Sequence, residues 1–175
     1  MTDAGAAMGG YRYVLHRKLS DDNPRRACFL MLNPSTATEE QDDQTIRKCK
    51  SFAESWGYGQ LTVVNLFALR ATKPRSLKLS ARPIGELNDD AILLHTSIAD
   101  LIVCAWGIHG DLYGRDRTVT DMLLSRGHEL HCVGLTKGGH PRHPLFAPKI
   151  SAPLPYYPPT PARFGYAAQP PTTPE

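Results

Sequence analysis

Four short segments of the chain carry side chains that could bind a ligand or take part in a reaction, and each segment directly follows an apolar run. Asn33 and Asn65 each supply an amide, which can donate and accept hydrogen bonds at the same time. His143 supplies an imidazole, whose charge near neutral pH responds to small changes in its surroundings. The candidate site residues in these segments are Asn33, Pro34, Ser35, Asn65, Phe67, Arg70, Trp106, Gly107, Arg142, His143, Leu145 and Phe146.

Two carboxylates, Asp42 and Asp43, follow the first of these segments. A neutral amide can orient a water molecule but cannot take its proton, so a hydrolytic site built on Asn33 would be slow without a carboxylate nearby. Both aspartates are also well placed to cap the helix predicted to follow them. Asp42, Asp43 or neither could assist a water molecule, and Asp43 stands among the candidate catalytic residues.

The segment GGHPRHPLF contains two histidines, His140 and His143. We favour His143 because Pro144, Leu145 and Phe146 follow it and place apolar side chains beside a polar contact. Both histidines could instead lie on the surface of a Pro-rich loop.

Five apolar runs predict the strands that position these segments. The last four are almost continuously hydrophobic, which is typical of strands covered on both faces. Helical patterns lie between them, and strands that alternate with helices form parallel sheets with right-handed crossovers. The sequence therefore predicts an α/β fold of three layers, α/β/α, with a central, mainly parallel four-stranded sheet. The predicted strands are 11–15, 27–32, 61–66, 100–106 and 130–135.

Three helices are expected from their caps and stop signals. In an open parallel sheet, ligands bind beyond the carboxyl ends of the strands, which is where the four segments should meet. The expected helix boundaries are Asp42 or Asp43 to Gly57, Asn88 or Asp89 to about residue 98, and 117–126 before Gly127.

The composition indicates one folded domain with a tail. A chain of 175 residues with 41% hydrophobic residues can bury one core and is short for two. We assign residues 1–150 to the domain and the Pro-rich residues 151–175 to an extended or disordered tail. No run resembles a membrane helix or a signal peptide, so we expect a cytoplasmic protein without membrane contact, and a monomer.

The four cysteines are far apart and form no C-x-x-C pair, so we expect reduced core thiols and no metal site. No P-loop or dinucleotide-binding fingerprint is present, and we expect no cofactor. The net charge of +3 is compatible with DNA contact without requiring it. Basic residues follow three of the predicted strands, either as a solvated surface or as a rim that faces phosphates: Arg70, Lys73, Arg75, Arg115, Arg117, Lys137, Arg142 and Lys149.

Four motifs, taken in order, resemble the uracil-DNA glycosylase superfamily, in particular its mismatch-specific branch. The segment MLNPS resembles the first motif, NLFALRAT the second, LIVCAWG the strand that ends in Trp-Gly, and HPL the late loop that intercalates into DNA. Order and approximate spacing agree over residues 27–148. The combination of LNPSTA, DDQTIRKC, VVNLFALRAT and PRHPLF is still more similar to a bacterial and phage family known only as domain of unknown function 1643.

The superfamily resemblance implies a DNA glycosylase, which hydrolyses the N-glycosidic bond of a flipped damaged or modified base in double- or single-stranded DNA. A role in phage DNA defence is a further hypothesis. The reaction passes through an oxocarbenium-like sugar and needs no metal. By this resemblance Asn33 positions the water, His143 donates to the leaving base or acts on it electrostatically, and Asn65 reads the flipped base.

The other candidates take their roles from the same resemblance. Leu145 and Phe146 form an apolar wedge that fills the gap left by the flipped nucleotide, or simply pack onto the protein. Trp106 stacks on a base or sugar, or belongs to the core. Arg70 and Arg142 contact DNA, and Arg70 could instead pair with an acidic side chain. Pro34, Ser35, Phe67 and Gly107 complete the substrate pocket.

The chain departs from the better-known glycosylases at three motifs. The first-motif carboxylate of some branches is absent, Arg-Ala-Thr replaces Arg-Pro-Thr, and His-Pro-Leu-Phe replaces His-Pro-Ser-Pro. These differences leave the substrate base open. Two other functions fit the same fold: a nucleotide- or nucleoside-binding hydrolase or transferase, and a non-catalytic nucleic-acid-binding module.

Overall fold

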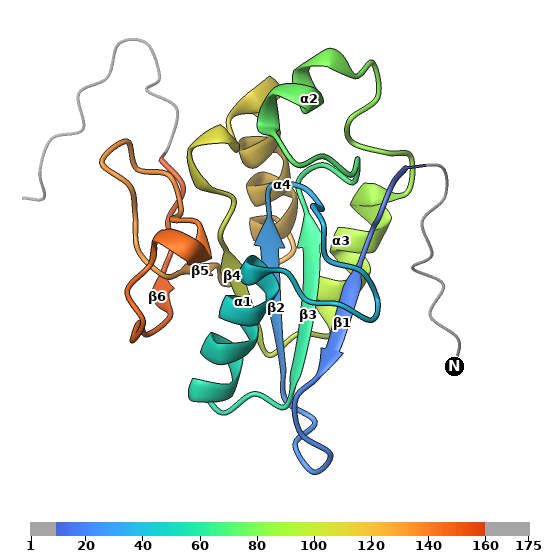
Figure 1. The fold of residues 1–175 in the computed structure, drawn as a ribbon. Coiled ribbons are helices and arrows are strands. Elements are labelled where there is room, and N and C mark those ends of the chain that lie inside the picture. Colours follow the sequence, from blue (N-terminus) through green and yellow to red (C-terminus); the bar gives the residue numbers. More distant parts are fainter. Residues whose placement is uncertain (1–9, 160–175) are drawn as a thin grey trace, which may run out of the picture.

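A computed structural model describes residues 10–159 and contains six strands and four α-helices within that range (Figure 1). The strands are β1 (Leu15–Lys18), β2 (Arg26–Met31), β3 (Gln60–Asn65), β4 (Leu101–Cys104), β5 (His131–Cys132) and β6 (Leu154–Pro155). The helices are α1 (Gln44–Ser55), α2 (Pro74–Leu79), α3 (Asn88–Ser97) and α4 (Arg115–Leu124). Short 3₁₀ helices lie at Gly107–His109, Leu112–Gly114 and Pro144–Phe146.

The strands form one mixed sheet in the order β1-β3-β2-β4-β5-β6. β3, β2, β4 and β5 are parallel neighbours, whereas β1 pairs antiparallel with β3 and β6 pairs antiparallel with β5. The chain therefore has the α/β fold that was predicted, but its sheet has six strands instead of four. The edge strand β6 was not predicted, because its two residues, LP, include a proline and form no apolar run. The other edge strand, β1, overlaps the predicted strand 11–15 only at Leu15 and continues into polar residues.

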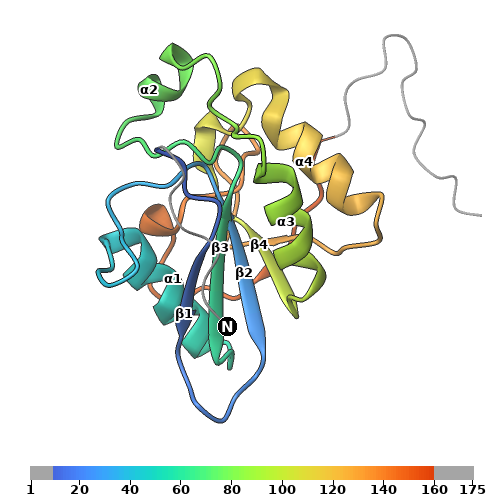
Figure 2. The ribbon, with the colours of Figure 1, turned by 90° about the vertical axis from the view of Figure 1, so that its right-hand side faces the viewer.

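Helices lie on both faces of the sheet, α1 on one face and α3 and α4 on the other (Figure 2). Side chains alternate along a strand, so successive residues of β2 point to opposite faces. Ala27 and Phe29 belong to the core beneath α1, whereas Cys28 and Leu30 belong to the core beneath α3 and α4. All four are fully buried, which explains why β2 reads as a continuous apolar run.

The position of α1 follows from its two ends and its buried side. The Asp43 carboxylate accepts a hydrogen bond from the backbone N–H of Ile46 at 2.8 Å and caps the helix, as predicted. Gly57 adopts a positive φ of 78° directly after the helix, which a residue with a side chain rarely does. Cys49 and Phe52 pack their buried side chains onto the sheet. The first turn of α1 is thereby held near the carboxyl ends of β2 and β3.

Two predicted strand boundaries were wrong for a local reason. Leu15 pairs with Val63, and the next contact between these two segments is a single bridge between Tyr11 and Leu69. The bridge lies four residues before Leu15 but six residues after Val63, so the pairing between the two is irregular. Because of this irregularity β1 begins only at Leu15, and residues 11–14 lie outside it although a strand was predicted there. β5 has two residues instead of six, because Gly134 has a φ of 123° and turns the chain away from the sheet.

The helices on the other face differ from prediction at their first residues. α3 has no side-chain cap, because Asn88 lies inside its first turn and directs its amide toward the end of β3. Asp89 pairs with Arg115 across the two helices. α4 begins at Arg115, two residues earlier than predicted, after Gly114 in the left-handed region. The helix α2, which was not predicted, begins with Pro74 at a first-turn position that proline favours.

Residues 151–159 pack onto the domain, although the sequence placed them in a tail. Tyr156 is only 5% exposed, and its ring meets Trp106 edge to face with centroids 5.9 Å apart. Its backbone N–H donates to the Leu130 carbonyl at 2.7 Å, and the Trp56 indole donates to the Ser151 carbonyl at 2.7 Å. The folded unit therefore extends past the predicted boundary at residue 150. Residues 1–9 of the predicted domain and 160–175 of the predicted tail lie outside the described residues.

The four cysteines are buried and unpaired, as expected for core thiols. Desolvation raises the pKa of Cys28 to about 12, so its thiol stays protonated. Within residues 10–159, no helix combines the length and apolar character needed to cross a membrane.

Candidate functional site

A cavity of about 740 Å³ lies at the carboxyl ends of the parallel strands. Its volume is within the range of sites for small molecules. Asn33 reaches it from the loop after β2, Asn65 from the end of β3, Trp106 and Gly107 from the loop after β4, and His143 from the loop after β5. The structure therefore brings together side chains from all four segments singled out in the sequence.

Asn65 is the last residue of β3 and is 2% exposed, yet its side-chain amide has no hydrogen-bond partner among residues 10–159. Its backbone is held from the other face of the sheet. The Asn88 amide donates to the carbonyls of Asn65 and Leu66 at 2.9 Å, and Arg115 Nε donates to the Leu66 carbonyl at 2.8 Å. An amide that lines a cavity and makes no hydrogen bond to the described residues keeps its donors and its acceptor for a ligand.

Asn33 has a different role in the structure, because its amide nitrogen is already used. Nδ2 donates to the carbonyl of Pro34 at 2.9 Å and to that of Ala71 at 2.7 Å, which ties the loop after β2 to the loop after β3. Because both partners are acceptors, the nitrogen must face them and Oδ1 must face away. Asn33 thus offers the cavity an acceptor only, which can orient a water molecule. Ser35 lines the cavity beside it.

The carboxylates of Asp42 and Asp43 have different surroundings. Asp43 lines the cavity while Oδ1 caps α1. Asp42 is not a cavity residue and accepts from Arg17 Nε at 2.7 Å and from Lys50 Nζ at 2.9 Å. Burial raises the pKa of Asp42, but these hydrogen bonds outweigh it and hold the pKa below its usual range. Of the two carboxylates, only Asp43 could take a proton in the cavity.

His143 lines the cavity, whereas His140 does not. The Nδ1 atom of His143 accepts from the backbone N–H of Leu145 at 3.3 Å, so in the neutral ring the proton is on Nε2. Burial lowers the pKa of His143, and the nearby Asp43 carboxylate opposes this only in part. The imidazole is therefore neutral at pH 7 and can donate one hydrogen bond from Nε2.

An apolar rim lies next to His143. Leu145 is 44% exposed and Phe146 is 76% exposed, and both line the cavity. Arg142 lines it as well and donates through Nη2 to the Leu135 carbonyl at 2.9 Å, which holds the loop in place. The two candidate wedge residues are thus exposed at the rim and are not packed into the core.

Four candidate residues lie elsewhere or are constrained by packing. Phe67 is fully buried in the core beneath α3 and α4, because the chain turns to that face after β3 ends. Pro34 and Arg70 do not line the cavity, and the Arg70 guanidinium donates to the Ala37 carbonyl at 3.2 Å. Trp106 reaches the cavity but is 1% exposed and packed against Tyr156, so its ring faces cannot stack on a ligand.

Sequence reasoning missed Arg12, which lines the cavity and is 6% exposed. Its Nη1 donates to the Ala37 carbonyl, and its Nε has no partner among the described residues. Desolvation lowers the pKa of Arg12 to about 10, with Arg70 acting in the same direction and Asp43 against it. The sequence does hold one signal for this position. Arg12 stands between Tyr11 and Tyr13, and successive side chains of an extended chain point to opposite faces, so Arg12 should point to the face opposite the two tyrosines. Further lining residues that were missed are Thr45, Thr72, Ile108, His109 and Thr136.

Among residues 10–159, no group of three or more metal-ligating side chains lies together. Fold and cavity define an α/β protein with a ligand-sized pocket at the carboxyl edge of its parallel strands. The chain belongs to the family described as "Protein of unknown function (DUF1643)", whose model matches residues 12–145. The matched range includes every cavity residue named above except Phe146. Searches among curated proteins and among solved structures each found no match.

Proposed function

We propose that the protein is a DNA glycosylase, which hydrolyses the N-glycosidic bond of a damaged or modified base turned out of DNA into this cavity. The observation that carries the proposal is the Asn65 amide, buried, unpaired within residues 10–159 and directed into a cavity that also receives Asn33 and His143. An amide can pair with a donor and an acceptor on the edge of a base. We also propose that β3, β2, β4 and β5 correspond to the parallel sheet of uracil-DNA glycosylases, with helices on both sides as outer layers.

The reaction can be assigned to the side chains around Asn65. Asn33 Oδ1 accepts from a water molecule and holds it for attack at C1′ of the sugar. Asp43 takes the proton of this water as the new C–O bond forms. The glycosidic bond breaks, its electron pair leaves with the base, and His143 Nε2–H donates to a base oxygen on which negative charge develops. Because the pKa of His143 is lowered, it acts as a neutral donor.

The rim accounts for DNA as the partner. A base that leaves the helix leaves a gap, and an exposed apolar side chain can fill it. Phe146 and Leu145 are exposed beside His143, and Arg142 adds positive charge next to them. Leu145, Phe146 and Arg142 line the same cavity as His143, which supports DNA as the partner.

The proposal is tested with single- and double-stranded oligonucleotides that carry uracil, mismatched bases, deaminated purines or modified pyrimidines. Abasic sites are detected by strand cleavage in alkali. We expect cleavage of at least one substrate by the wild-type protein and a loss of about 100-fold or more in Asn65→Ala, because a donor to the reacting base is removed. The proposal fails if wild-type protein leaves every oligonucleotide intact.

A matched variant separates the site from the fold. Asn65→Ala removes an amide with no hydrogen bond in the described structure, so its free energy of unfolding should stay close to that of the wild type. Asn88→Ala removes an amide that holds two carbonyls at the end of β3, and we expect it to lose stability. Equal loss of stability in both variants would contradict the assignment of Asn65 to the ligand.

One observation favours a second function, a hydrolase or transferase that acts on free nucleotides. Arg12 brings a positive charge into the cavity, where it could bind a phosphate. Release of the base from free nucleotides but not from oligonucleotides would select this function. Binding of DNA without any cleavage would instead select a non-catalytic module.

A further inference from the structure

Arg12 is a buried cation that no carboxylate of the described residues neutralises by direct contact. Arg12 is 6% exposed, and its guanidinium donates through Nη1 to the Ala37 carbonyl, an acceptor that it shares with Arg70. Its Nε has no partner within residues 10–159. Removing a charge from water is costly unless a counter-charge and hydrogen bonds replace the lost hydration. Among the described residues, the Arg12 guanidinium therefore has a donor without an acceptor and a charge without a directly bound counter-charge.

The charged groups around Arg12 also favour the binding of an anion there. Arg70 and Arg17 lie close enough to disfavour its charged form, and Asp43 is the nearby group that favours it. Asp42 is not available, because Arg17 and Lys50 bind both of its oxygens. The local cluster is more cationic than anionic: Arg12, Arg17, Lys50 and Arg70 face Asp42 and Asp43.

Part of the cavity wall is apolar. Met31, Ile46 and Val63 line the same cavity and supply no acceptor from their side chains. A charge–charge contact is much stronger beside such groups than in water, because little solvent screens it. A guanidinium also offers a planar set of donors that matches the two oxygens of a carboxylate or phosphate.

We infer that Arg12 forms a subsite for an oxyanion, a carboxylate or a phosphate, on the molecule that occupies the cavity. The inference extends the proposed function by naming the class of substrate, a nucleobase compound that carries such a group. The oxyanion has two possible sources. It is either a carboxylate attached to the base or the phosphate of a free nucleotide.

Calorimetric titration with four probes distinguishes these sources. Uracil is compared with 5-carboxyuracil, and deoxyuridine with deoxyuridine 5′-monophosphate. We expect one anionic probe to bind about 10-fold or more tightly than its neutral counterpart, as a charged hydrogen bond would produce. A preference for 5-carboxyuracil assigns the carboxylate on the base, and a preference for the nucleotide assigns the phosphate. If neither anionic probe is preferred, the inference is wrong.

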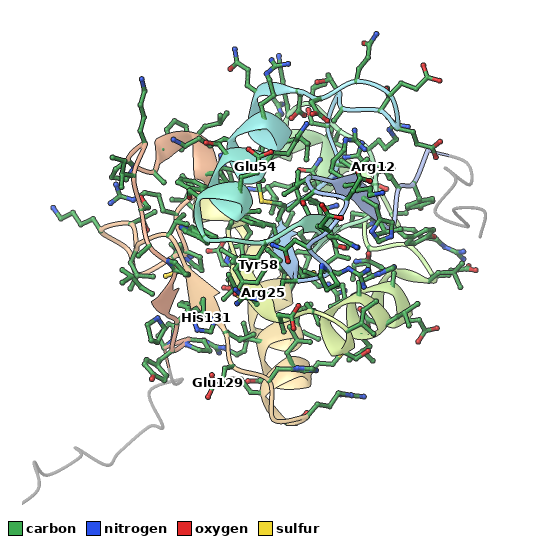
Figure 3. The ribbon with its side chains drawn as sticks, turned by 90° about the horizontal axis from the view of Figure 1, so that it is seen from below. Arg12, Arg25, Glu54, Tyr58, Glu129 and His131 are labelled. Carbon is green, nitrogen blue, oxygen red and sulfur yellow. The ribbon has the colours of Figure 1, made fainter. Side chains whose placement is uncertain are left out.

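Two variants with the same loss of charge provide the control. Arg12→Met should reduce the preference to less than about threefold, since only screened long-range attraction remains. Arg25→Met should retain it. Arg25 is exposed and lies over the Tyr58 ring at 4.5 Å, and Figure 3 shows this pair apart from Arg12. A preference that persists in Arg12→Met would mean that another group binds the anion.

A measurement on the wild-type protein does not depend on the folding of any variant. The ¹⁵Nε resonance of Arg12, identified by its absence in Arg12→Lys, should shift with the preferred anionic probe and stay unchanged with the neutral one. An unchanged resonance at saturation would overturn the inference. Oligonucleotide cleavage without anion preference refutes only the subsite, whereas anion preference without cleavage refutes only the glycosylase.

Discussion

Asp43 occupies two positions at once, the N-cap of α1 and the wall of the cavity, and substitution can separate them. Asp43→Asn keeps an oxygen that can accept from the Ile46 N–H but removes the charge. Asp43→Ala removes both. The cap geometry is favourable, with a 2.8 Å hydrogen bond and extended backbone angles of −80° and 178° at the cap residue.

The two variants should differ in stability by the value of the cap alone. Loss of an N-cap costs about 1 kcal/mol, so Asp43→Ala should have a free energy of unfolding lower than that of Asp43→Asn by this amount. In a domain of this size, the difference lowers the Tm by about 2–4 °C. Both variants lose the carboxylate that takes the proton of water, so both should lose about 100-fold or more of the rate.

Urea unfolding measures the first quantity, and single-turnover release of base from whichever oligonucleotide the wild-type protein cleaves measures the second. Asp42→Asn is the control, because it removes the same charge one position earlier and outside the cavity. It should lose stability through its contacts with Arg17 and Lys50 and keep its rate. A wild-type rate in Asp43→Asn would show that Asp43 only caps the helix. Equal stability of the Asn and Ala variants would refute the value given to the cap.

Three further outcomes follow from contacts around the site. Tyr156→Ala should destabilise the protein by about 3–5 kcal/mol in urea unfolding, because it empties a buried position against Trp106; a near-neutral effect would place residues 151–159 outside the folded unit. Gly110→Ala should lower the Tm, since its Cβ would lie 2.0 Å from Trp106 Cδ1. The folded state holds the pKa of His143 below 6.5, so protonation favours unfolding and stability should fall as the pH falls through about 6.5. NMR titration and the loss of this slope in His143→Gln check the assignment.

Local patterns in the sequence were sufficient for the parts of the fold that are buried on both faces. β2, β3 and β4 read as apolar runs because nearly all their residues are buried, and Asp43 and Gly57 delimit α1 through contacts within a few residues. β6 and the first turn of α3 depend on partners that are distant in the chain. Asn88 has the residue type of a helix cap, but the carbonyls at the end of β3 take its amide instead.

The sequence alone determined that Asn33, Asn65 and His143 should approach one another, because the carboxyl ends of parallel strands meet at one edge of a sheet. Only the tertiary structure decided which neighbouring side chains share their cavity. Beyond the last paired residue of a strand, alternation no longer dictates the face, so Phe67 turned into the core. Arg12 lies between the paired residues Tyr11 and Leu15, in an irregular part of the sheet edge that the local pattern did not reveal, and it enters the cavity from there. The chemistry of each side chain is local, whereas its neighbours depend on how the whole chain packs.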